Sequence, residues 1–271
     1  MDGERIDVSD PGVEVKRTLN MEHGVETIEI MRTTTGTRLI VRLFMSHSDA
    51  HTGAAEFIVI PGGKGTIRRK SSIDPNVGGS DHWTIIGRGE EGDVSYMSVK
   101  TRQSGITVTE AVKHRIPRDA KIGKDRFVEL LVKAGTRYVF EDILQIYTSL
   151  DSANPENEAV KKAGDAAPFG KLLKAQEKIW AEHWKNAGIR ITGEGEKVKE
   201  YQRAINFMVY QLISLGFLAD GYSGMGAKGY NLPDDGYRGH HFWDFEIFVF
   251  PFFCTFFPEV ARNFLRFRYH T

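Results

Sequence analysis

The first half of the chain alternates apolar and polar residues with a period of two, which is typical of β-strands. Leu39, Val41 and Leu43 share one face of such a segment, and the residues between them share the other. Because turn-forming glycines and prolines separate many short segments of this kind, the pattern predicts an antiparallel β-sandwich over residues 1–150. The further strands expected are residues 27–32, 56–60, 83–86, 96–100, 106–112, 126–132 and 138–146.

Helical periodicity replaces the strand pattern in the second half of the chain. Residues 151–168 are polar and rich in turn-forming residues, which indicates an interdomain linker. A linker helix is expected over residues 169–186, and its two tryptophans, Trp180 and Trp184, are expected to pack on a neighbour. A longer helix, over residues 194–215, carries one apolar stripe at spacings of three and four: Val198, Tyr201, Ile205, Met208, Leu212 and Leu215.

These patterns divide the chain into a β-domain over residues 1–150, a linker with a helix over 151–193 and a helical domain over 194–271. Pro258 and Glu259 predict the start of a further helix in that last domain, because proline suits a first helical turn and a carboxylate suits the positive helix end.

Composition narrows the class of protein. Acidic and basic residues number 36 each, so no net charge recruits a nucleic acid or an anionic membrane. The apolar residues 245–257 are interrupted by Pro251 and are fewer than the roughly 20 needed to span a bilayer. The N-terminus lacks an apolar signal region, so a cytoplasmic protein is expected. The one cysteine, Cys254, excludes an internal disulfide, and a buried, inert thiol is expected.

Three polar groups in the β-domain are interpreted as structural. His47, Asp49 and His51 alternate as metal ligands can, but no fourth ligand accompanies them, and no metal site is expected. The sequence 81–83 places Trp83 beside polar residues, and packing in the sandwich core is favoured over contact with a sugar. The basic run 68–70 is interpreted as a solvated strand end.

Aromatic, acidic and basic side chains are most concentrated in the segment Gly236-Tyr237-Arg238-Gly239-His240-His241-Phe242-Trp243-Asp244-Phe245-Glu246. Sugars are bound by such a mixture, because an aromatic face covers the apolar side of the ring and a carboxylate accepts hydrogen bonds from hydroxyls. The competing interpretation is that Trp243 and Phe242 belong to the core and that Asp244 caps a helix.

This segment, with the Ile-Phe and Pro-Phe-Phe residues that follow and the run Pro258-Glu259-Val260-Ala261-Arg262, resembles glycoside hydrolase family 65. The signature of that family reads Gly-Tyr-x-Gly-His-x-Phe-Trp-Asp-Thr-Glu-Ile-Phe. One departure is visible, because Phe245 stands where the family has threonine. The family contains inverting phosphorylases of maltose, trehalose, kojibiose and nigerose.

The resemblance implies a β-sandwich followed by a linker helix and the first helices of an (α/α)6 barrel. It also implies phosphorolysis of an α-linked glucose disaccharide, with inorganic phosphate as co-substrate and no cofactor or metal. Trp243 and Asp244 would form part of the glucose subsite, with Arg238 and His240 at its edge. A homodimer is compatible with this assignment.

The same resemblance places the general acid and the phosphate-binding groups beyond Thr271, since residues 195–271 suffice for about three helices. The sandwich is also expected to be incomplete, so this chain alone is expected to be inactive. Glu246 is a poor replacement for the acid, because it lies beside the sugar-binding carboxylate. The alternatives are a non-catalytic carbohydrate-binding or scaffold module and a hydrolase of the trehalose type.

Overall fold

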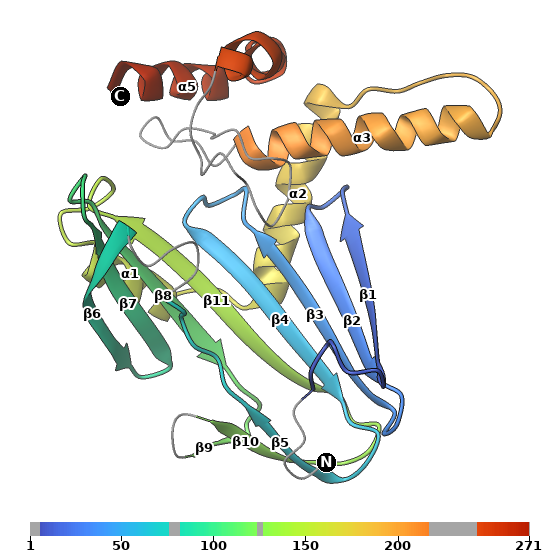
Figure 1. Ribbon diagram of the computed structural model, residues 1–271, viewed down its shortest axis with the longest axis vertical. Coiled ribbons are helices and arrows are strands. Elements are labelled where there is room, and N and C mark those ends of the chain that lie inside the picture. Colours follow the sequence, from blue (N-terminus) through green and yellow to red (C-terminus); the bar gives the residue numbers. More distant parts are fainter. Residues whose placement is uncertain (1–5, 76–81, 124–126, 217–242, 271) are drawn as a thin grey trace. The chain divides into compact units, whose positions relative to one another are not determined.

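The computed structural model describes residues 6–75, 82–123, 127–216 and 243–270. These residues form two compact units (Figure 1). Unit 1 comprises Met1–Asn20 and Val25–Lys174, and unit 2 comprises Met21–Gly24 and Ala175–Thr271. The predicted order of β-structure followed by helices is confirmed.

Unit 1 is built on an eight-stranded sheet in which all neighbouring strands are antiparallel. The strand order is β1-β2-β3-β4-β11-β8-β7-β6, so the late strand β11 lies between β4 and β8. A smaller sheet has the order β5-β10-β9. The strands are β1 Val13–Asn20, β2 Val25–Arg32, β3 Thr37–Met45, β4 Thr52–Ile60, β5 Gly65–Arg69, β6 Trp83–Glu91, β7 Val94–Thr101, β8 Thr107–Arg115, β9 Lys121–Ile122, β10 Val128–Val132 and β11 Tyr138–Thr148.

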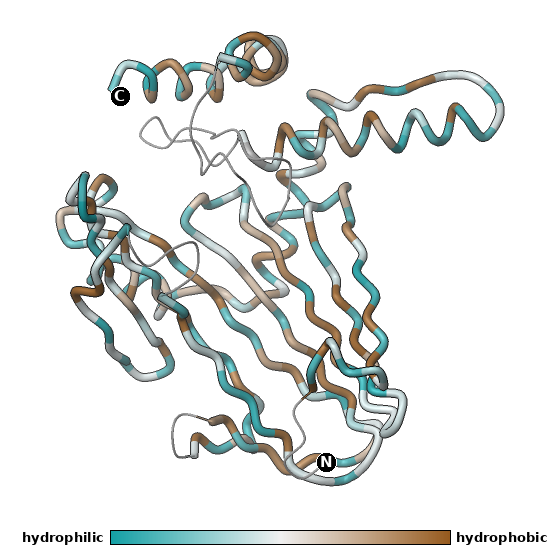
Figure 2. The backbone as a smooth tube through the Cα atoms, viewed as in Figure 1, coloured by the Kyte–Doolittle hydropathy of each residue, from teal (hydrophilic) through white to brown (hydrophobic). Residues whose placement is uncertain are grey.

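Hydrophobic and hydrophilic residues alternate along several strands of the large sheet (Figure 2), so its two faces carry different side chains. On one face, Phe44 and Ile143 pack against Phe169 at the start of helix α2, Phe169–Ala187. The other face packs in part against the smaller sheet, through a cluster that includes Phe140 and Leu130. The polar cluster described below lies on the same face, where β7, β8 and β11 meet.

The stretch expected to be a linker contains a helix, α1, Pro155–Gly164. The Asn154 side chain accepts a hydrogen bond from the Asn157 N–H, and Pro155 occupies the first turn. Ala159 and Ala163 are fully buried beside the sheet. The residues that suggested a turn therefore begin a helix, because asparagine followed by proline serves equally at a helix start.

Unit 2 is helical. Its elements are the second part of α2, α3 Glu196–Gly216, the π-helical turn η3 Phe245–Val249, α4 Phe250–Phe256 and α5 Pro258–His270. The helix predicted at Pro258 is confirmed, and Trp180 packs on a neighbouring helix as expected, with its ring stacked 5.1 Å from that of Tyr210. The core gathers residues of all these helices: Trp180, Ala187, Val209, Ile213, Phe245, Phe253, Phe257, Val260, Ala261 and Phe264.

The face that α3 buries differs from the predicted stripe. Val209 and Ile213 are buried, whereas Tyr201 and Met208 of the stripe are 58% and 63% exposed. Periodicity alone identified the more continuous apolar row, but the contacts with Trp180 and Phe253 select the neighbouring row. The prediction is therefore wrong for Tyr201 and Met208, whereas Ile205 and Leu212 of the stripe do pack against the core.

Cys254 is exposed, contrary to the expectation of a buried thiol. On the short helix α4, Phe253 turns into the core at 0% exposure, so the next residue faces away from it. No helix among the described residues is both long and apolar enough to cross a bilayer.

One glycine of unit 2 is required by packing. Gly24 has a φ of 64°, a conformation that favours glycine, and a Cβ at this position would lie 2.5 Å from the indole of Trp180. The turn at residues 21–24 therefore approaches the buried indole closely, and the neighbouring Trp184 donates its indole N–H to the Met21 carbonyl at 2.9 Å.

Candidate functional site

The signature residues Trp243 and Asp244 directly precede η3 and are both exposed. The Trp243 side chain is 67% exposed, and Asp244 makes no side-chain capping hydrogen bond. The alternative in which Trp243 is a core residue and Asp244 a helix cap is therefore not what is observed. Arg238 and His240 lie outside the described residues.

The π-helical turn determines which signature residues face outward. The Phe250 N–H donates to the Phe245 carbonyl, five residues earlier, which widens the turn. The Phe245 ring is consequently buried, 4.7 Å from the Phe264 ring, while Ile247 and Phe248 are exposed. Turns of this type occur frequently at functional sites.

Two further signature residues have structural partners. Phe245, which replaces the family's threonine, is 6% exposed and points into the core, whereas its neighbour Asp244 is exposed. The Glu246 carboxylate accepts a hydrogen bond from Nε of Arg268 on α5 at 2.7 Å and forms an ion pair with Nη2 of the same residue at 2.6 Å. The position of Glu246 thus supports a role in joining η3 to α5.

The exposed part of the signature combines an aromatic surface with a carboxylate. The Trp243 and Phe248 rings are 6.2 Å apart and inclined at 49°, and Asp244 follows Trp243 directly. An aromatic face of this kind can cover the C–H groups of a sugar ring, and a carboxylate can accept hydrogen bonds from its hydroxyls.

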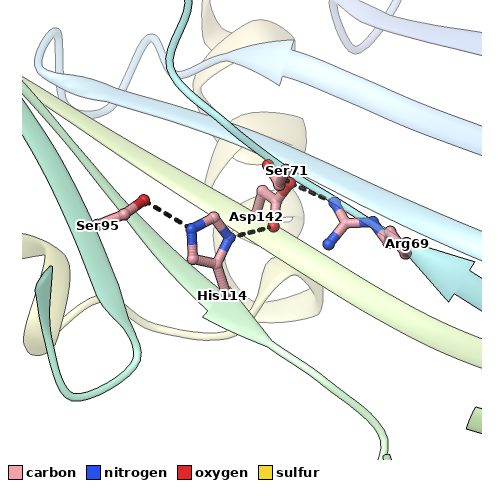
Figure 3. Close-up of polar contacts among 5 residues, drawn as sticks. All are labelled: Arg69, Ser71, Ser95, His114 and Asp142. Carbon is pink, nitrogen blue, oxygen red and sulfur yellow. Dashed lines mark hydrogen bonds and ion pairs between the residues drawn. The ribbon is translucent and has the colours of Figure 1, made fainter. Parts of the chain in front are cut away.

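A second candidate place, in unit 1, is a chain of polar side chains from three adjacent strands (Figure 3). The Ser95 hydroxyl of β7 lies 2.8 Å from Nε2 of His114 on β8. Nδ1 of the same imidazole lies 2.9 Å from Oδ1 of Asp142 on β11. Arg69, the last residue of β5, forms an ion pair with the other carboxylate oxygen, Oδ2. Ser71 donates to that oxygen at 2.9 Å.

These partners keep the Asp142 carboxylate ionised. Burial alone would raise the pKa of Asp142, but the hydrogen bond from His114 and the charge of Arg69 outweigh burial, so the pKa lies below its ordinary value. Because an ionised carboxylate only accepts hydrogen bonds, Nδ1 of His114 carries a proton.

No local pattern in the sequence marks this cluster. His114 is directly opposite Asp142 in the sheet, and Ser95 is opposite Val112, two residues before His114. Its members come from separate strands, so only the strand order and register bring them together. The basic run at the end of β5 is the one local feature near the cluster. Arg69 does end the strand, but its side chain is only 15% exposed and pairs with Asp142, so the expectation that it is solvated is wrong.

The other polar groups singled out in the sequence have local roles. Asp49 accepts hydrogen bonds from the His51 N–H and the Thr52 hydroxyl, and the His51 ring stacks on Tyr147 at 4.1 Å. Trp83 is half-buried on the edge strand β6 and donates its indole N–H to the Pro75 carbonyl at 3.0 Å, outside the core clusters of the described residues.

Comparison with known families matches both parts of the chain. The glycosyl hydrolase family 65 N-terminal domain matches residues 1–183, and the family 65 central catalytic domain matches residues 206–271. Both matches follow the order of the two units along the chain.

Among curated proteins, the α,α-trehalose phosphorylase of Thermoanaerobacter brockii is 29% identical over 100% of this chain. The kojibiose phosphorylase of Halothermothrix orenii is 27% identical, also over 100%. The chain spans 38% of the length of each. The solved structure named "Putative kojibiose phosphorylase from human microbiome" has a TM-score of 0.83 at 21% identity, covering 99% of this chain and 37% of its own, and shares the fold.

Proposed function

Because the chain belongs to glycosyl hydrolase family 65, we propose that it forms part of an inverting disaccharide phosphorylase. The observation that carries the proposal is the exposed Trp243–Asp244 pair within a segment that matches the family's catalytic domain. Since this sequence spans 38% of its relatives' length, the activity is proposed for a protein of their length that carries it.

In the proposed reaction, inorganic phosphate attacks the anomeric carbon of an α-linked glucose unit from the face opposite the bond that breaks. The bond to the leaving sugar's oxygen breaks, and that oxygen takes a proton from a general acid. The products are β-glucose 1-phosphate and the released sugar. Phosphate is already anionic, so this reaction needs no general base to activate a water molecule.

Within this reaction, the residues of this chain bind and orient glucose. The Asp244 carboxylate accepts hydrogen bonds from two adjacent hydroxyls, and the Trp243 indole covers the apolar side of the ring. Binding at these groups holds the anomeric carbon in place while phosphate approaches. Arg238 and His240 are proposed at the edge of the same subsite.

The test is made on this sequence extended with the C-terminal part of a family 65 phosphorylase, with kojibiose and trehalose as substrates. Asp244→Ala removes hydrogen bonds to a charged group, each worth about 1.5–3 kcal/mol, so we expect kcat/KM for phosphorolysis to fall at least about tenfold. Trp243→Ala should also lower kcat/KM, because the sugar ring loses the apolar surface that covers it.

Matched controls remove the same chemical groups elsewhere in unit 2. Glu259 is an exposed carboxylate in the first turn of α5, and Tyr269 is an aromatic residue that is 86% exposed. Glu259→Ala and Tyr269→Ala should leave kcat/KM within about twofold. Phosphorolysis undiminished by Asp244→Ala would remove Asp244 from the site.

A further inference from the structure

The polar cluster of unit 1 opens into a pocket that the proposed reaction does not use. The pocket has a volume of about 1210 Å³ and lies between the segment after β5, the β6–β7 hairpin and the end of β8. Ser71, Ser95 and His114 contribute to its lining. A monosaccharide-sized ligand fits well within this volume.

The hydrogen-bond directions in the cluster determine what the pocket offers a ligand. When the His114 imidazole is neutral, its protonated Nδ1 leaves Nε2 as an acceptor, so the Ser95 hydroxyl donates its proton to Nε2. Ser71 donates its proton to Asp142. Both serine oxygens therefore keep lone pairs for a ligand that donates hydrogen bonds, as a hydroxylated molecule does.

Besides the serine acceptors, the pocket also offers a ligand positively charged side chains. The lining includes Arg69, Lys70, Arg88 and Arg115 against Glu90 and Asp93. Arg69 is neutralised by Asp142, and Arg115 lies 3.6 Å from Glu141.

Lys70 and Arg88 have no carboxylate within 4.0 Å in the described part of the chain, although the Lys70 ammonium lies over the Phe127 ring, 5.5 Å from its centroid. Both are exposed at the pocket. Arg88 is opposite Met97 in the sheet, and Met97 lies two residues after Ser95, so Arg88 shares the face that carries Ser95.

We propose that this pocket binds a phosphate monoester of a small sugar or polyol. The anionic group contacts Arg88 and Lys70, and the ligand's hydroxyls donate to the oxygens of Ser95 and Ser71. A neutral sugar would leave Arg88 and Lys70 without an anion, and inorganic phosphate offers the serine oxygens fewer hydroxyl donors than a sugar phosphate does. Because the pocket offers both cations and hydrogen-bond acceptors, the ligand that fits best carries a negative charge and hydroxyl groups.

The experiment titrates the full chain with three probes, glucose 6-phosphate, glucose and inorganic phosphate, by isothermal titration calorimetry. Glucose 6-phosphate should bind most tightly, and its affinity should fall as sodium chloride is raised. Arg88→Gln should weaken its binding about tenfold or more, and Ser95→Ala about threefold or more. Arg102→Gln, which removes an exposed charge beyond the end of β7, should leave the affinity unchanged.

Two further measurements distinguish this pocket from the glucose subsite of unit 2. Asp244→Ala disables that proposed subsite and should leave this binding intact, so the result does not depend on the proposed phosphorolysis. Loss of binding in Asp244→Ala but not in Arg88→Gln would place the probe at the other site and overturn the proposal. No saturable binding at about 10 mM glucose 6-phosphate, or equal affinity for inorganic phosphate, would also overturn it.

Discussion

Among the residues that the structure describes, His183 on α2 has the largest change in pKa on folding. Burial lowers its pKa from 6.5 to about 4. The imidazole is 3% exposed and meets the rings of Trp180 and Phe257 edge to face, each 5.8 Å away. The folded protein therefore holds this histidine neutral at pH values where an unfolded chain would protonate it.

This shift predicts a loss of stability in acid. Because the unfolded state binds the proton near pH 6.5 and the folded state only near pH 4, stability is full above pH 6.5 and falls as the pH drops between these values. The contribution lost at pH 5 is roughly 2 kcal/mol. Urea unfolding at pH 7 and pH 5 measures it, and His183→Gln should abolish that part of the difference.

His82→Gln is the matched control, because His82 is exposed. It should leave the difference between pH 7 and pH 5 unchanged. If His183→Gln leaves the difference in the free energy of unfolding between pH 7 and pH 5 unchanged, other groups cause that difference.

The residues of the two candidate sites differ in how far sequence can reveal them. Trp243 and Asp244 are adjacent in the chain, so their combined chemistry is visible in the sequence itself. Ser95, His114 and Asp142 meet only through the pairing of β7, β8 and β11, and no local spacing encodes that pairing. Sites assembled across strands are invisible to motif reasoning for this reason.

At the scale of single elements, α1 depends on Asn154, the capping residue that directly precedes it. Asn154 satisfies the Asn157 N–H at 3.1 Å, one of the backbone donors that a helix start leaves without an intrahelical partner. Asn154→Ala should lower the free energy of unfolding by about 1 kcal/mol, whereas Asn154→Asp, which keeps the acceptor, should change it little. Urea denaturation at pH 7 measures both. Equal effects of the two substitutions would show that the cap is not the cause.

Elements are predicted well where periodicity and packing agree. Most strands and the helix at residues 169–186 are placed correctly because their apolar faces are the faces that become buried. The helix α1 is missed because its cap resembles a turn, and the buried row of α3 is only partly predicted because two apolar rows lie side by side. Contacts with other elements decide that residues 155–164 form a helix and which row of α3 is buried.

At the scale of the whole molecule, the balance of charge predicts weak colloidal stability near neutrality. The sequence pI is about 7.1, and acidic and basic residues are equal in number. Self-association should therefore be greatest near pH 7 and decline towards pH 9, where net charge restores repulsion. Light scattering at constant ionic strength measures this. Scattering independent of pH would indicate that exposed apolar side chains, rather than charge balance, control association.

The order of β-structure before helices is predictable because apolar residues recur with the period of strands in the first half of the chain and with that of helices in the second. The division into a large and a small sheet is not, since β11 enters the large sheet between strands that lie far from it in sequence. Helix α2 contributes Phe169 to the core of unit 1 and Trp180 to that of unit 2, so one continuous helix serves both cores.

The close approach of Gly24 to the Trp180 indole has an evolutionary consequence. With Trp180 in place, any side chain at position 24 would strike the ring, so the two positions cannot vary independently. Relatives that retain the tryptophan should retain the glycine, and substitutions at position 24 should appear only where the partner has become smaller. Positions 24 and 180 are thus expected to co-vary among relatives, which helps to align distant sequences.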